Sequence, residues 1–231
     1  MDTLTIERRF RGPAQSAHGG YFSGRIARFC DQPVRVRLRA PPPLDVPLAV
    51  TRQASGHLEI RQGGRLIGEA EPAGVALEAS PPVDYVRALE ASQHYAGFHH
   101  HVFPECFVCG PKRARPDGLR VFAGPVGDGR VAAPWMPDAS LAEGDGKVAA
   151  EFMWAALDCP GYFAVSPDSR PMLLAEFTAH VDRRVHALEP CVIVAWPVSS
   201  AGRRHEAGTA LYDEDGEPCA RARALWIEPR V

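Results

Sequence analysis

Long apolar runs are missing from this sequence. None of its 231 residues lies in a stretch close to the about 18 consecutive apolar residues that a membrane-spanning helix requires. Residues 1–10 alternate in polarity and carry charge, so they lack the pattern of a secretory signal. Glycine-rich phosphate loops and the dinucleotide-binding fingerprint are also missing. We therefore expect no membrane partner and no cofactor.

Net charge is also small. The 26 Lys and Arg nearly balance the 28 Asp and Glu, which leaves a formal charge of −2. A general electrostatic field that attracts nucleic acid or an anionic membrane is therefore not expected. The six cysteines occur without a secretion signal, so we expect reduced thiols in a cytoplasmic protein.

Proline and glycine, by contrast, are abundant. The chain contains 22 Pro and 21 Gly spread among many short segments, which is typical of a turn-rich β protein. Hydrophobic residues make up 45% of the chain, enough to bury a core. The length allows one large domain or two small ones.

The strongest helix prediction is the segment 147–162. Its apolar residues leave no continuous polar stripe, which is typical of a helix in the middle of a core. Glu151 and Asp158 interrupt it, and a buried carboxylate is unfavourable unless it is paired, protonated or used in chemistry. Pro160 is expected to end or kink the helix, because it lacks a backbone donor and disfavours helical geometry at Cys159.

Alternating polarity and turn residues predict strands in both parts of the chain. In the first part they cover 3–10, 33–39, 46–53, 57–61 and 66–70, with a hairpin turn at 62–65. In the second part they cover 118–123, 129–134, 173–184, 191–199, 205–212 and 218–227. A further helix is predicted over 21–30, with Ser16 as its N-cap.

The order of these elements repeats. Each half has a strand, a helix and then three or four strands, which indicates a duplication. We predict an N-terminal half at 1–77, a connecting helix and linker at 78–104, and a C-terminal half at 105–231. A core helix wrapped by an antiparallel sheet satisfies the pattern of both halves.

Two short motifs carry a resemblance to a known family. His18-Gly19-Gly20-Tyr21 resembles the motif that opens the central helix in phenylacetyl-CoA-type thioesterases. The run 106–119, with Cys106-x-x-Cys109-Gly and a later Gly-Leu, resembles a lead-in to the first strand of some hotdog proteins. The resemblance implies an α+β protein of two fused hotdog domains, each an antiparallel sheet around a central helix, in the acyl-CoA thioesterase superfamily.

The family motif is split between the two halves. In that family an Asp lies nine residues after the His, and the active site pairs the His-Gly-Gly of one subunit with the Asp of the other. Here position 27 is Ala27, so the first half lacks the acid, whereas Asp158 has Ala149 nine residues before it. If the halves pack as a pseudo-dimer, we expect one composite site that joins His18 to Asp158. The opposite site would pair Ala149 with Ala27 and be inactive.

Such a site suits the hydrolysis of an acyl-CoA-type thioester. Glycines at a helix start let backbone N–H groups approach a carbonyl oxygen, and the helix dipole adds positive charge. Asp158 is the expected general base or nucleophile, its pKa raised by burial and by a nearby helix C-terminus. His18 is expected to bind the carbonyl or orient water. The expected oxyanion and substrate-binding residues are Gly19, Gly20, Tyr21 and Glu151.

Other interpretations stay open. The fold also suits a dehydratase or hydratase, or a non-catalytic acyl-CoA-binding protein. His18 could be a capping residue and Asp158 a paired structural acid. A homo-oligomer formed through sheet edges is a further alternative. The basic segments Arg183-Arg184 and Lys112-Arg113-x-Arg115 are predicted to be solvated surface residues, with contacts to coenzyme A phosphates as the alternative.

The cysteines suggest further alternatives. Cys106-x-x-Cys109 has zinc-knuckle spacing, but no second cysteine pair follows it. We therefore predict a turn with two packed thiols and no metal, with His99–His101 as the further donors if zinc binds. Cys159 as a nucleophile is a weaker alternative, because no motif places a histidine beside it.

Overall fold

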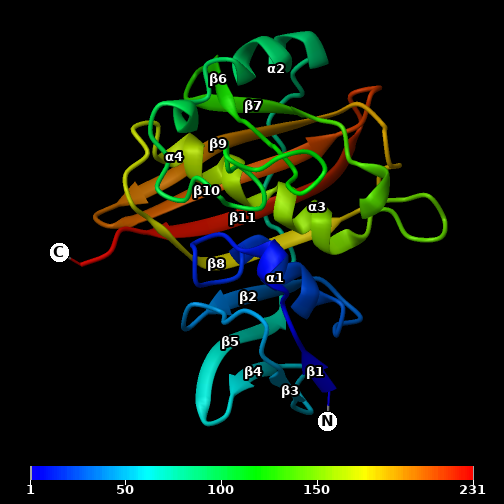
Figure 1. Cartoon of the computed structure of the whole chain (residues 1–231), viewed down its shortest axis with the longest axis vertical. Helices are drawn as coiled ribbons and strands as arrows, with labels where there is room; N and C mark the ends of the chain where they lie inside the picture. Colours follow the sequence, from blue (N-terminus) through cyan, green and yellow to red (C-terminus); the bar gives the residue numbers. More distant parts are fainter. Residues whose placement is uncertain (1, 231) are drawn as a thin grey trace.

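One antiparallel sheet runs through residues 2–230, the part of the chain described by a computed structural model (Figure 1). Its strand order is β1-β3-β4-β5-β2-β8-β11-β10-β9-β7-β6. The strands are β1 (Asp2–Leu4), β2 (Val34–Leu38), β3 (Leu48–Arg52), β4 (Leu58–Gln62), β5 (Arg65–Pro72), β6 (Gly124–Gly127), β7 (Arg130–Trp135), β8 (Leu173–Val181), β9 (Cys191–Ala201), β10 (Arg204–Tyr212) and β11 (Pro218–Ile227).

Four α-helices and three short 3-10 turns accompany the sheet. The helices are α1 (Gly19–Ala27), α2 (Tyr85–Ser92), α3 (Ala150–Ala156) and α4 (Asp158–Val165). The 3-10 turns are η1 (Arg8–Phe10), η2 (Ala96–Phe98) and η3 (Ala139–Leu141). None of the helices among residues 2–230 has the length and hydropathy of a membrane span.

The two halves of the sheet meet at β2 and β8. Val34 pairs with Ala179 and Val36 with Phe177, so the sheet is continuous from β1–β5 into β6–β11. Each half contributes a helix to the space between them, α1 from the first and α3 from the second, whereas α4 packs on strands β9 and β10 of its own half (Figure 1). This is the arrangement expected of two fused hotdog domains. The boundaries 1–77, 78–104 and 105–231 stay a prediction, as does oligomer formation through the edge strands β1 and β6.

The outer face of the sheet carries charged residues along β2. On β2, Val34 and Val36 are buried, whereas Arg35 and Arg37 point outward and pair with carboxylates of the flanking strands. Glu71 of β5 holds Arg35, and the Arg37 guanidinium lies 2.9 Å from Glu176 of β8. The alternation therefore separates a buried aliphatic face from an ion-paired one.

Helices α1 and α3 lie in direct contact at the centre of the molecule. A Cβ at Gly24 would lie 2.7 Å from Glu151 Cα, and one at Gly20 would lie 2.6 Å from Asp158 Cβ. Real side chains cannot approach so closely, so only glycine permits this helix spacing. The motif glycine Gly20 therefore serves helix packing as well as the site.

The predicted helix over 147–162 is divided in two. Helix α3 ends at Ala156, Leu157 forms the junction, and α4 begins at Asp158. The sequence predicted that Pro160 ends or kinks the helix. The break lies at Leu157, three residues before Pro160, and helical geometry continues through Cys159 and Pro160. Pro160 lies in the first turn of α4, where backbone N–H groups have no intrahelical acceptor and a proline removes nothing.

Three smaller predictions also differ from the structure. Ser16 does not cap α1, because His18 occupies the N-cap position. The strand predicted over 118–123 is an extended loop, and β6 begins at Gly124, where the backbone passes so close to α2 that a Cβ would overlap Ala91. The strand predicted over 3–10 is limited to β1 and is followed by η1.

Candidate functional site

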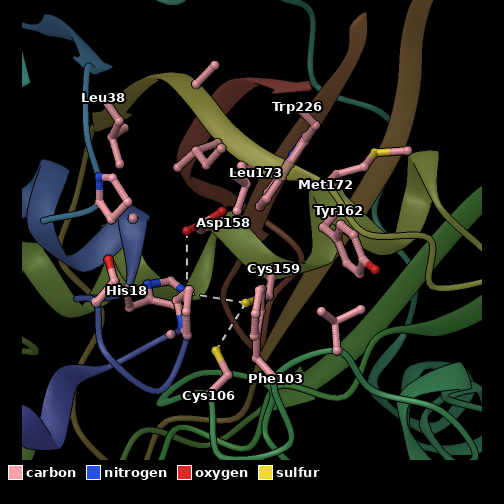
Figure 2. A pocket seen from close by; sticks show the side chains of 18 of the residues that line it. His18, Leu38, Phe103, Cys106, Asp158, Cys159, Tyr162, Met172, Leu173 and Trp226 are labelled. Carbon is pink, nitrogen blue, oxygen red and sulfur yellow. Dashed lines mark hydrogen bonds and ion pairs between the residues drawn. The ribbon is translucent and has the colours of Figure 1, made fainter. Parts of the chain in front are cut away.

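A cavity of about 670 Å³ lies at the junction of the two halves. Its wall comes from the loop before α1, the end of β2, the loop after η2, helix α4, and strands β8 and β11. Figure 2 shows side chains around it, with His18 and Asp158 next to one another. Most of the lining is apolar and includes Leu38, Phe103, Tyr162, Met172, Leu173 and Trp226.

His18 forms the N-cap of α1 and reaches the other half of the chain. Its Nδ1 accepts a hydrogen bond from the Tyr21 N–H at 3.2 Å. Its Nε2 lies 3.3 Å from Asp158 Oδ2 and 3.2 Å from Cys159 Sγ. Because Nδ1 is an acceptor, the proton of the neutral ring is on Nε2. Burial disfavours the charged ring, but Asp158 and Cys106 more than offset this and raise the pKa of His18; a second proton on Nδ1 would nevertheless break the cap.

Asp158 is buried at the start of α4 and faces the start of α1. The Gly20 N–H donates to its Oδ2 at 2.6 Å, so this acid acts as a second cap for a helix of the other half. Burial raises its pKa to about 6, against the opposing effects of His18 and the Gly20 N–H. The expected helix C-terminus is not the cause, because Asp158 is the first residue of a helix.

The other oxygen of this carboxylate has no partner. Asp158 Oδ1 is buried and accepts no hydrogen bond from any described residue. An unsatisfied buried acceptor typically costs about 1–3 kcal/mol. The position is therefore suited to a bound molecule that brings a proton, such as water.

Gly19 provides a free donor at the same place. It lines the cavity, and its N–H has no acceptor among residues 2–230, whereas those of Gly20 and Tyr21 are bonded to Asp158 and His18. A Cβ at Gly19 would lie 2.7 Å from Leu174 Cδ2, so a side chain would close this approach. The first N–H of α1 is thus the one left for a ligand.

Tyr21 and Glu151, the other two predicted substrate-binding residues, do not line the cavity. The Tyr21 ring stacks on Phe10 with the ring centroids 4.2 Å apart. The buried Glu151 carboxylate accepts a hydrogen bond from Arg28 at 2.8 Å. The structure therefore brings together His18, Gly19, Gly20 and Asp158 and leaves Tyr21 and Glu151 in the packing around them.

The opposite pairing, of the start of α3 with the end of α1, lacks the groups of the first site. Ala149 occupies the N-cap position of α3, as His18 does in α1, and has no side-chain group to donate or accept. The second residue of α3 is Glu151, held by Arg28 from the end of α1. An ion pair therefore stands where the first site has a glycine and a carboxylate.

Sequence analysis considered three cysteines and a histidine as alternatives but did not place them at this site. Cys106, Cys109, Cys159 and His101 all line the cavity. Cys159 lies beside His18, and Cys106 Sγ lies 3.8 Å from Cys159 Sγ. The Cys-x-x-Cys spacing was the only signal, and nothing in the sequence indicates that Cys159 joins it.

Arg183 and Arg184, considered as an alternative for phosphate contacts, lie away from the cavity. Arg183 pairs with Asp213, and Arg184 pairs with Glu143 and Asp145, and neither arginine lines the cavity. Arg39 and Arg203 are the arginines in its wall.

No protein-family model matches the chain, and no curated protein matches it in sequence. Solved structures match it in shape over nearly all of its length. A candidate thioesterase II from Thermobifida fusca has a TM-score of 0.60 at 16% identity and covers 99% of this chain and 92% of its own. The tesB protein from Mycobacterium avium subspecies paratuberculosis has a TM-score of 0.59 at 15% identity, with 93% and 88% covered.

A candidate thioesterase from Novosphingobium aromaticivorans is similar to the same degree. Its TM-score is 0.59 at 14% identity, and the match covers 99% of this chain and 95% of that one. At these identities the likeness concerns the fold. The chain has the α+β fold of two fused hotdog domains found in thioesterase-superfamily proteins, as the sequence predicted.

Proposed function

We propose that this chain hydrolyses an acyl thioester of the acyl-CoA type at one composite site between its two halves. The observation that carries the proposal is the contact between the start of α1 and Asp158 at the wall of an apolar cavity. One half supplies backbone donors and the other supplies an acid, and both lie beside space for an acyl group.

The acyl chain fills the cavity and its carbonyl lies at the start of α1. Gly19 donates its free N–H to the carbonyl oxygen, and the dipole of α1 adds positive charge there. A single donor of this kind is typically worth about 10²–10³ in rate. The donor acts most strongly on the oxyanion of the tetrahedral intermediate, when the charge is largest.

Asp158 is the general base. Its Oδ2 is fixed by the Gly20 N–H, which leaves Oδ1 to take a proton from water as the water oxygen attacks the carbonyl carbon. The tetrahedral intermediate then collapses, the carbon–sulfur bond breaks, and the proton on Asp158 passes to the departing thiolate. Such a base typically contributes about 10²–10⁴ in rate.

His18 is a positioning residue in this scheme. It caps α1 through Nδ1 and contacts Asp158 Oδ2 through Nε2, so it ties the acid to the helix that holds the carbonyl. Its Nε2–H also faces Cys159, and both contacts engage the same nitrogen. That geometry differs from a Cys-His-Asp triad, in which the acid holds the nitrogen opposite the nucleophile.

The test compares two buried acids on the paired helices. We expect Asp158→Asn to lower kcat for acyl-CoA hydrolysis by about 10²–10⁴, measured as released thiol across aliphatic and aromatic acyl groups. Glu151→Gln is the matched control, since Glu151 is equally buried but lies outside the cavity. Full activity in Asp158→Asn, or hydration of enoyl-CoA with no thiol released from any acyl-CoA, contradicts the proposal.

A further inference from the structure

Three cysteines at the cavity wall have no part in the proposed hydrolysis. Cys106 and Cys109 lie on the loop between η2 and β6, and Cys159 lies in the first turn of α4. All three are buried, all three line the cavity, and all three are free thiols. The sequence predicted a lone Cys-x-x-Cys pair, and the fold adds a third cysteine from helix α4.

Two of the sulfur atoms have the spacing of metal-bound thiolates. Cys106 Sγ lies 3.8 Å from Cys159 Sγ, and Cys109 belongs to the same turn as Cys106, in which the Gly110 N–H donates to the Cys106 carbonyl. With a zinc–sulfur bond of about 2.3 Å, two thiolates at the corners of a tetrahedron lie about 3.8 Å apart. The Cys106–Cys159 sulfur separation therefore equals that of two thiolates on one zinc ion (Figure 2).

Two histidines direct N–H groups at this cluster. His18 Nε2 lies 3.2 Å from Cys159 Sγ, and His101 Nε2 lies 3.3 Å from Cys109 Sγ. In both rings Nδ1 accepts a backbone N–H, from Tyr21 in one case and Phe103 in the other. Nε2 therefore carries the proton, and each ring donates to a sulfur.

This arrangement decides which atoms can be ligands. His18 Nε2 lies within 4.8 Å of the Cys106 and Cys159 sulfurs, so distance alone allows it to bind the same ion. Its proton occupies the lone pair that a metal needs, and moving that proton to Nδ1 would break the cap of α1. The histidines therefore stabilise thiolate charge, and the sulfurs bind the ion.

We propose that Cys106, Cys109 and Cys159 form a site for Zn²⁺ with three thiolate ligands and a fourth position that faces the cavity. Each thiol loses its proton on binding, and soft sulfur ligands favour Zn²⁺ over Mg²⁺ or Ca²⁺. The ion joins the loop between η2 and β6 to the helix that begins with Asp158. This site is independent of the proposed hydrolysis.

Cobalt titration of the reduced, metal-free chain tests the site. We expect one Co²⁺ per chain, displaced by Zn²⁺, with a sulfur-to-cobalt charge-transfer band of three thiolates. Cys106→Ser, Cys109→Ser and Cys159→Ser should each lose about a third of the band or more. The matched control is Cys219→Ser, because Cys219 is equally buried but lies on β11. Cys219→Ser and His18→Asn should both keep the full charge-transfer band.

Three results overturn the proposal. The first is no charge-transfer band at one equivalent of Co²⁺ in the parent chain. The second is equal loss in Cys219→Ser, and the third is a full band in Cys109→Ser together with loss in His18→Asn, which makes His18 the third ligand. Circular dichroism shows whether each variant folds. If a variant does not fold, the intensity of the band and the number of Co²⁺ ions bound by the parent chain decide whether the site exists. A melting temperature of the parent chain that rises with Zn²⁺ but not with Mg²⁺ supports it.

Discussion

Gly20 and Gly24 offer a matched pair of substitutions on the face of α1 that packs against the second half. A Cβ at position 20 would lie 2.6 Å from Asp158 Cβ and 2.9 Å from the Trp154 carbonyl oxygen. A Cβ at position 24 would lie 2.7 Å from Glu151 Cα. Main-chain atoms and Cβ atoms cannot rotate away from a clash, so Gly20→Ala and Gly24→Ala should each push the helices apart.

The expected loss of stability is similar for both variants. Overpacking of a core costs about 1–3 kcal/mol, and the upper part of that range applies where backbone is contacted. Alanine in place of a helical glycine offsets about 0.8–1.0 kcal/mol of it. The net loss is about 1–2 kcal/mol, and at about 2–4 °C per kcal/mol the melting temperature should fall by about 2–8 °C. Thermal unfolding followed by circular dichroism measures this shift.

The two variants should differ in activity. Only Gly20 contacts the acid, so its substitution displaces the Asp158 carboxylate, and a shift of about 1 Å can lower turnover about 10²-fold. Gly24→Ala should keep kcat for thiol release within a few-fold of the parent chain. Equal losses of kcat in both variants, or a parental melting temperature in Gly20→Ala, would refute the argument that this packing positions the acid.

Substitutions at His18, Arg28, Glu151 and Phe103 test the groups around the contact between α1 and Asp158. His18→Asn keeps an N-cap acceptor and removes the ring that contacts Asp158, so kcat should fall about tenfold while urea unfolding shows a loss below about 1 kcal/mol. Arg28→Ala leaves the buried Glu151 carboxylate poorly paired and should destabilise the chain by about 1–3 kcal/mol. Adding Glu151→Gln should recover most of that loss in a double-mutant cycle. Phe103→Ala enlarges the cavity and should raise kcat/KM for bulkier acyl groups relative to smaller ones by about tenfold.

The local sequence pattern alone predicted most of the strands in the second half of the sheet. Strands β8 to β11 follow the predicted ranges, because their alternation is regular and Gly or Asp marks the turns between them. The contact between His18 and Asp158 also followed from sequence, since each half lacked the residue that the other retained. Whether that contact is catalytic stays a prediction.

The errors share a physical cause, which is that they depend on tertiary placement. Pro160 predicted an end or a kink near Cys159, and only the fold shows that the break lies at Leu157 and that a new helix starts two residues before the proline. The helix C-terminus expected to raise the pKa of Asp158 is not there. The Asp158 carboxylate accepts a hydrogen bond from the start of α1 in the other half, and that contact could not be derived from its own helix. The contact of Cys106 with Cys159 joins a loop to a helix, and no sequence periodicity encodes it.

The most direct test of the central claim is a crystal structure of the Asp158→Asn chain with an unreactive acyl-thioester analogue. The composite site predicts the carbonyl oxygen within about 3 Å of the Gly19 nitrogen, a hydrogen-bond distance. It also predicts the carbonyl carbon beside residue 158 and the acyl group in the cavity. An analogue bound at the opposite pairing of Ala149 and Ala27, or outside the cavity, would contradict it.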